Sequence, residues 1–145
     1  MLIKGAILEE MGRSFPYSVS RPITISNIEL SAPLNHEVLV RIESAGICHS
    51  DLAVVQGVRP RPTPMLLGHE AAGIVESFGS EVKGLNVGDR VVMTFAPRCG
   101  NCLGCSSNGA MSCIAGTKSN VAGELLSGGQ RLTRASSKER SPKDA

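Results

Sequence analysis

Four cysteines lie close together in the last third of the chain. Two residues separate Cys99 from Cys102 and Cys102 from Cys105, and seven separate Cys105 from Cys113. Four thiolates can close a tetrahedral zinc site with bonds of about 2.3 Å, leaving no position open for a substrate. An iron–sulfur cluster and a disulfide pair are rival interpretations, but a ferredoxin run has a shorter last gap followed by proline, whereas Ile114 follows here. The spacing therefore predicts a structural zinc ion.

One further cysteine, Cys48, and one histidine, His69, could belong to a second site. Cys48 follows one predicted strand and His69 begins another, far apart in sequence. A thiolate and an imidazole at two strand ends would supply two ligands of an open zinc site. On residue type alone, a lone cysteine is more often a small buried apolar residue and a lone histidine a hydrogen-bonded one. Both interpretations stay open at this level.

Two short motifs surround this pair. The run Gly46–Asp51 reads Gly-Ile-Cys-His-Ser-Asp, and the run Gly68–Val82 reads Gly-His-Glu-x-x-Gly, five residues, Gly, two residues, Val. The second motif is similar to the zinc signature of the zinc-dependent alcohol dehydrogenases of the medium-chain dehydrogenase/reductase superfamily. Together with the cysteine cluster, the motifs stand in that family's order and at similar separations. The chain resembles this family from about Leu2 to Leu132.

The resemblance implies a mainly β fold. Its main part would be a GroES-like, partly open β-barrel with a short helix and a zinc-binding lobe, joined in the family to a Rossmann domain that binds the dinucleotide. Two zinc ions (Zn²⁺) are implied. Cys48 and His69 would bind the catalytic ion. The structural ion would be bound by Cys99, Cys102, Cys105 and Cys113.

Three residues beside these ligands have implied catalytic roles. Asp51 would orient His69, and Glu70 would be a nearby carboxylate able to approach the metal. Ser50 would hydrogen-bond the substrate hydroxyl and pass its proton outward. From residue type alone, Ser50 and Asp51 also fit as caps of a short helix and Glu70 as a solvated charge at a strand end.

Two more residues occupy positions that face the cofactor or the substrate in the family. The resemblance implies that His49 contacts the pyrophosphate of NAD(P) and that Phe95 lines the substrate pocket. The remaining histidine, His36, lies in a predicted turn and is expected at the surface.

The chain also departs from the family in three ways. The third ligand of the catalytic zinc is a downstream cysteine in relatives, and no cysteine follows Cys113. No Gly-x-Gly-x-x-Gly motif or alternation of strands and helices predicts a dinucleotide fold. Ala53 stands where many relatives have a histidine that ends the proton relay, a role that water can take.

The elements that must position these residues are mostly short strands separated by Gly- and Pro-rich turns, as in a barrel or sandwich. One short helix is predicted at Ser50–Val55. After Leu132 the sequence becomes charged and Ser-rich. We therefore expect an incomplete domain over residues 1–132, with a zinc lobe at 97–115, and a disordered tail over 133–145. The predicted strands are Leu2–Leu8, Ile23–Leu30, Val38–Ile42, Gly73–Phe78 and Arg90–Phe95.

Composition excludes several classes of function. The chain has 145 residues, 41% hydrophobic and 19% charged, with a formal net charge of +2. Five of its 15 Lys and Arg residues fall in 130–145, so the body before that segment is slightly acidic. With no Trp, one Tyr and three Phe, it also has little on which to stack bases, and we expect no nucleic-acid partner. No signal peptide or span of about 20 apolar residues is evident, so we expect a cytoplasmic protein with no membrane partner.

The predicted function is the oxidation of an alcohol to an aldehyde or ketone with NAD(P). Without the third ligand and the cofactor domain, this chain is expected to be inactive alone, as a fragment, a truncated product or an alternative C-terminus. The alternative is a non-catalytic zinc-binding module whose unpaired barrel edge engages a partner, such as a second copy in a homo-oligomer. About two zinc ions per chain would favour the first, and one the second.

Overall fold

The structure, a computed structural model, describes residues 1–134. Its strands are β1 (Leu2–Leu8), β2 (Ile23–Leu30), β3 (Val38–Gly46), β4 (Met65–Leu66), β5 (Glu70–Phe78), β6 (Arg90–Val92) and β7 (Leu132–Arg134). Its helices are α1 (Tyr17–Ser20), α2 (His49–Val55), α3 (Leu103–Ser106) and α4 (Ile114–Ala122).

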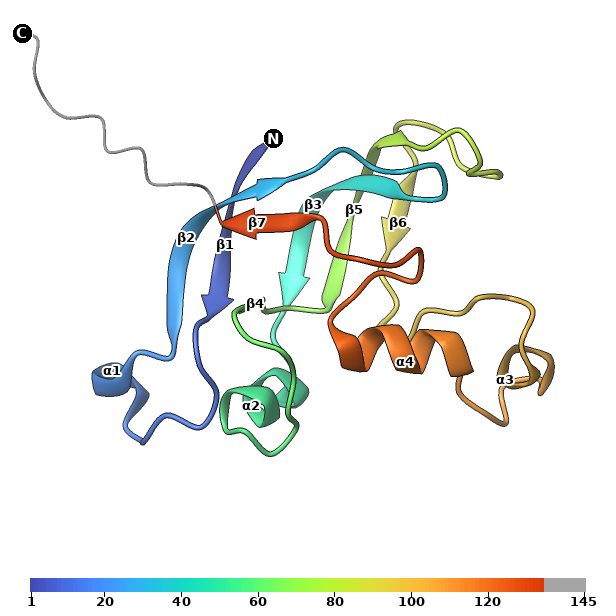
Figure 1. Cartoon of the computed structure of the whole chain (residues 1–145). Coiled ribbons are helices and arrows are strands. Elements are labelled where there is room, and N and C mark those ends of the chain that lie inside the picture. Colours follow the sequence, from blue (N-terminus) through green and yellow to red (C-terminus); the bar gives the residue numbers. More distant parts are fainter. Residues whose placement is uncertain (135–145) are drawn as a thin grey trace, which may run out of the picture.

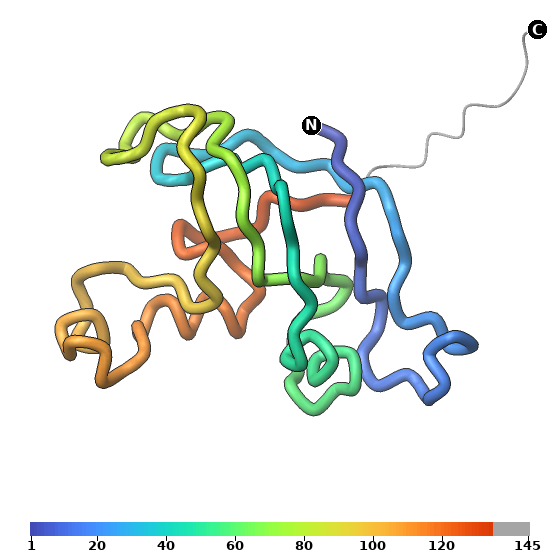
Figure 2. Tube along the Cα trace, turned by 180° about the vertical axis from the view of Figure 1, so that it is seen from behind, coloured from blue at the N-terminus to red at the C-terminus, as the bar shows by residue number. Residues whose placement is uncertain are grey.

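The strands form two antiparallel sheets. One has the order β4-β1-β2-β7 and the other the order β3-β5-β6. In Figure 1 the sheets curl toward each other as an open barrel, and the helices gather at one end of the strands. The tube in Figure 2 shows the β5–β6 loop at the opposite end from α2. This architecture confirms the predicted mainly β, partly open barrel.

Two predicted strands match β1 and β2 residue for residue. β3 runs to Gly46 and β5 starts at Glu70 because their pairing continues, after a register shift between Ile42 and Ser44, to the pair Gly46 and Glu70. β6 ends at Val92 and leaves the predicted strand residue Phe95 outside the sheet, since β6 pairs with β5 over three residues only.

The sequence predicts one helix, whereas the described residues form four. The longest, α4, is rich in residues of low helix propensity, which is why its sequence does not predict it. The features that start and stop α4 lie just outside the helix. The Cys113 sulfur accepts a hydrogen bond from the Gly116 amide at the start, and Gly123 ends the helix in the left-handed conformation.

β7 runs two residues past the predicted domain boundary at 132. Thr133 and Arg134 pair with Glu29 and Ile28 of β2, so the backbone there is part of the sheet. The rest of the predicted tail, residues 135–145, lies outside the described residues.

A small apolar cluster fixes α2 on the first sheet. Leu8 of β1 is fully buried and packs with Val54 and Val55 from the last turn of α2. Met65 and Leu67, which precede the β5 strand, pack against the same cluster. The cluster therefore brings the start of α2 and the segment before β5 to one place.

Several apolar strand residues stay exposed. Ile25 of β2 is 68% exposed and Val92 of β6 is 77% exposed. Exposed apolar strand surface favours association between copies, and a homo-oligomer stays a prediction. Within residues 1–134, none of the helices has the length and apolar character needed to cross a membrane.

A largely buried ion pair joins the segment before β3 to the segment before β7. Arg131 donates from Nε to Glu37 Oε2 at 2.9 Å and from Nη2 to Glu37 Oε1 at 2.7 Å. The two side chains are 16% and 10% exposed. The Arg131 hydrogen bonds, with smaller contributions from the Leu34 amide and the Ser127 hydroxyl, lower the pKa of Glu37 to about 2. The pair thus holds the short β7 against the barrel.

Replacing Glu37 by glutamine should lower the free energy of unfolding at pH 7 by about 2–3 kcal/mol, because Arg131 would lose its charged partner. The folded-state pKa of Glu37 lies below its ordinary value of 4.5, so this stabilisation is present above pH 4.5. It is lost as the pH falls toward 2. Urea unfolding across this range measures the difference. Glu43→Gln, at an exposed ion pair with Arg41, is the control and should change stability by less than about 0.5 kcal/mol. A difference between Glu37→Gln and the original chain that does not shrink on acidification would contradict this account.

Candidate metal centres

The structure brings the four clustered cysteines together. Their sulfur atoms lie within 4.8 Å of one another. The separations are 3.9 Å for Cys99–Cys105, 3.7 Å for Cys102–Cys105 and 3.8 Å for Cys102–Cys113. A tetrahedron with zinc–sulfur bonds of about 2.3 Å has edges of about 3.8 Å. The donor set and its spacing therefore fit zinc.

Two short helices aim these sulfurs inward. Cys102 immediately precedes α3, and Cys105 lies three residues later on the same face of that helix. Cys113 immediately precedes α4 and is 3% exposed. The Cys113 sulfur accepts hydrogen bonds from the amides of Cys99 at 3.3 Å and Gly116 at 3.2 Å. Such amide donors favour the anionic form of sulfur, which is the form that binds a metal.

Backbone hydrogen bonds lower the pKa of two of the four thiols. Hydrogen bonds from the backbone of Ile114 and then Cys105 lower the pKa of Cys102 to about 6. The amides of Cys99 and then Gly116 lower the pKa of Cys113 from its ordinary value. Cys102 is thus prepared as a thiolate near neutral pH, and the backbone donors shift the pKa of Cys113 in the same direction.

A second group of metal-ligand types lies between α2 and β5. Donor atoms of Cys48, His69 and Glu70 lie within 4.8 Å of one another. Glu70 faces Gly46 in the β3–β5 pair, and its carboxylate lies over the Gly46 backbone. The family resemblance implies that Glu70 is a nearby carboxylate able to approach the metal, and here it completes a set of three donors. One sulfur, one imidazole and one carboxylate fit a zinc site with an open position.

The start of α2 positions Cys48. The Cys48 amide donates to Asp51 Oδ2 at 2.9 Å, while the Cys48 sulfur accepts from the Ser50 amide at 3.5 Å. The Asp51 amide also faces the Cys48 sulfur, so Cys48 and Asp51 form a reciprocal capping box, with Cys48 where serine or threonine is usual. Asp51 therefore caps α2, as its residue type allows.

Asp51 also contacts His69. The Asp51 side chain is buried, and its Oδ1 lies 3.2 Å from His69 Nδ1. A carboxylate at Nδ1 holds the proton there and leaves Nε2 free to bind a metal. Ser50 Oγ lies 3.1 Å from His69 Nε2 and 3.3 Å from the Cys48 sulfur. Gly68, with φ of +98°, makes the turn into His69, which an L side chain would oppose.

Phe95 lies beside the second metal centre, whereas the two other histidines, His49 and His36, lie at the surface. The Phe95 ring packs on His69 with centroids 4.8 Å apart, so Phe95 borders the second metal centre. The His49 residue is exposed at the start of α2. His36 forms an exposed pair with Glu81, as a surface position should.

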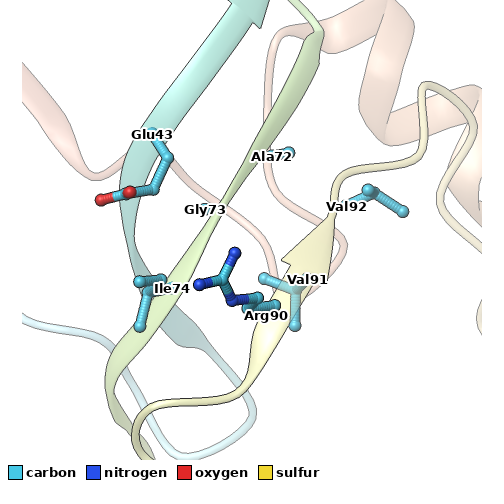
Figure 3. A pocket seen from close by; sticks show the side chains of 7 residues that line it. All are labelled: Glu43, Ala72, Gly73, Ile74, Arg90, Val91 and Val92. Carbon is cyan, nitrogen blue, oxygen red and sulfur yellow. The ribbon is translucent and has the colours of Figure 1, made fainter.

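Two hollows lie on the described part of the molecule. One, of about 270 Å³, lies over β3, β5 and β6 and is lined by residues such as Glu43, Ile74 and Arg90, with no predicted site residue among them (Figure 3). The other, of about 220 Å³, is lined by Phe95, Arg59 and Arg61 together with residues of the cysteine lobe and α4. Sequence reasoning missed the two arginines because their Pro-rich segment resembles an ordinary turn.

Comparison with known proteins decides the family. The model of the alcohol dehydrogenase GroES-like domain matches residues 34–140. The chain belongs to this family.

Solved structures agree with the alcohol dehydrogenase GroES-like assignment. An alcohol dehydrogenase zinc-binding domain protein from Burkholderia ambifaria is 35% identical with a TM-score of 0.80, over 93% of this chain. Benzyl alcohol dehydrogenase from Acinetobacter calcoaceticus is 30% identical with a TM-score of 0.76, over 92%. A cobalt- and zinc-bound thermostable alcohol dehydrogenase from Pyrobaculum aerophilum is 30% identical with a TM-score of 0.67, over 79%. The matches cover 34%, 34% and 33% of these three chains, so this chain spans about a third of their length.

Proposed function

We propose that this chain is the zinc-binding part of an NAD(P)-linked dehydrogenase that oxidises an alcohol to an aldehyde or ketone. Cys48, His69 and Glu70 hold the catalytic zinc. The structural zinc is held by Cys99, Cys102, Cys105 and Cys113. The observation that carries the proposal is the contact between buried Asp51 and His69, which directs Nε2 toward the other two donors.

Bound zinc acts as a Lewis acid that lowers the pKa of an oxygen it holds. Around it, each residue of the chain has a separate task. Asp51 keeps the proton on His69 Nδ1 and so fixes the orientation of the ring. Ser50 Oγ lies between the Cys48 sulfur and His69 Nε2, where it accepts the proton of the substrate hydroxyl and passes its own proton to water. Phe95 covers one side of His69 and excludes water there.

Hydride transfer also needs a bound nicotinamide cofactor. Residues 1–134 form two small antiparallel sheets, with no parallel dinucleotide-binding sheet among them. We therefore expect the 145-residue chain alone to bind metal without turnover, and His49, exposed at the start of α2, to reach the cofactor of a neighbouring domain. We further propose residues 1–134 as one domain carrying the lobe at 97–115. A cytoplasmic location is proposed from the clustered thiols, which bind zinc only while reduced.

Metal stoichiometry tests the proposal. The chain should bind about two equivalents of zinc or cobalt, and Cys48→Ser should bind about one, because the hydroxyl of serine stays protonated and is a poor ligand. Metal analysis after gel filtration counts the ions, and cobalt absorption shows how many thiolates each contacts. The free energy of unfolding of Cys48→Ser should remain within about 1 kcal/mol of the original chain.

A single equivalent in the original chain would contradict the proposal and favour a non-catalytic zinc module. Two equivalents retained by Cys48→Ser would place the second ion elsewhere. Cys102→Ser is the matched comparison, since it should lose the other ion.

A further inference from the structure

The Phe95 ring lines one hollow and also packs on His69 of the second metal centre. The Phe95 ring lies 4.8 Å from the His69 ring, measured between centroids, and 5.9 Å from Arg59 Cζ. The same ring therefore contacts a metal-ligand residue and a guanidinium group.

Two arginines line this hollow, and no acidic residue of the described part of the chain does. Arg59 and Arg61 form no ion pair within residues 1–134, whereas four of the seven other arginines described there do. Arg61 is held by neutral acceptors, with Nη1 donating to Pro60 O at 2.9 Å and Nη2 to Asn120 Oδ1 at 3.1 Å. The hollow thus carries positive charge that no described carboxylate balances.

The backbone holds these side chains in place. The Arg59 amide donates to Ala53 O at 3.1 Å, which attaches the arginine segment to α2. Asn120 of α4 donates to Phe95 O at 3.4 Å, so Arg61, Asn120 and Phe95 form one connected set. The rest of the lining includes Pro97 and Val121, which suit the apolar part of a ligand.

We propose that the substrate of this enzyme is an alcohol carrying a carboxylate, which Arg59 binds while the hydroxyl faces the Cys48–His69–Glu70 centre. The planar guanidinium of Arg59 matches a carboxylate in two-point hydrogen bonding. Arg61 adds positive charge, and Phe95 supports the apolar body between the two ends. The inference rests on the proposed function, since it names the substrate class of that site.

Isothermal titration of the zinc-loaded 145-residue chain tests the inference with two ligands of similar shape, 4-(hydroxymethyl)benzoate and 4-methylbenzyl alcohol. The carboxylate should bind about tenfold tighter, the effect of one charge-assisted interaction. Arg59→Met keeps the aliphatic stem and should remove this preference. Arg59→Lys should retain part of it. Lys83→Gln, a loss of the same charge in the exposed β5–β6 loop, should leave it unchanged.

Equal binding of the two ligands, or a preference that survives Arg59→Met, would overturn the inference. A second experiment measures whether inorganic phosphate or ADP displaces the bound carboxylate ligand. If either displaces the carboxylate at equal concentration, the hollow is a general anion or cofactor-phosphate site, and the substrate assignment is wrong. Repeating the titration with Cys48→Ser, which should keep the zinc of the cysteine lobe and lose the other ion, separates the two proposals. An Arg59-dependent preference in a chain that binds only one zinc ion would support the carboxylate site while contradicting the catalytic centre.

Discussion

Replacing Cys102 by serine should remove the tightly held zinc of the cysteine lobe and lower the free energy of unfolding by about 4 kcal/mol or more. Cys102 is the thiol with a pKa of about 6, and its sulfur lies 3.7 Å from that of Cys105 and 3.8 Å from that of Cys113. A serine hydroxyl stays protonated at neutral pH and cannot take the place of this thiolate. The lobe has little else to hold it, because Leu103 and Ile114 beside the ligands are exposed.

Zinc release to a chromophoric chelator and urea unfolding measure the two effects of Cys102→Ser together. Cys48→Ser is the matched control, since it makes the same chemical change outside the lobe. A chelator should also destabilise the original chain to about the level of Cys102→Ser. Unchanged stability and zinc content in Cys102→Ser would show that the four sulfurs do not share one ion.

The second large effect is expected for Gly116→Ala, which should lower the free energy of unfolding by about 3 kcal/mol. Helix propensity alone predicts the opposite sign, since alanine is favoured over glycine in a helix by about 1 kcal/mol. Steric overlap decides the outcome. A Cβ on Gly116 would lie 1.9 Å from Pro97 O, a backbone atom that cannot move away without shifting the lobe. That shift would also disturb the Gly116 amide that donates to the Cys113 sulfur.

Thr117→Ala introduces the same residue one position later on α4, where the side chain is exposed. It should change the free energy of unfolding by less than about 0.5 kcal/mol. Thermal or urea unfolding of the two variants, each with its zinc content, compares them directly. A stabilised Gly116→Ala would contradict the close approach of α4 to Pro97.

Local patterns explain the parts of the fold that the sequence predicts well. β1 and β2 match because each is a short β-type run bounded by charged or turn residues, so pattern and element coincide. No pattern in the sequence predicts α4, because its stability comes from the Cys113 cap and from its close contact with Pro97. Neither is a property of the residues within the helix. β7 is likewise a strand only because β2 offers a free edge beside it.

The same division separates the candidate sites. Ligand type and spacing by themselves predicted the four-cysteine cluster, because its members lie within fifteen residues and a short loop can bring them together. Only the tertiary structure shows that the donor atoms of Cys48, His69 and Glu70 lie within 4.8 Å of one another, and that Arg59 lies over the Phe95 ring that packs on His69. These side chains come from segments that are far apart along the chain. Only the packing of α2 on β1 and the register of β3 with β5 set the distances between them.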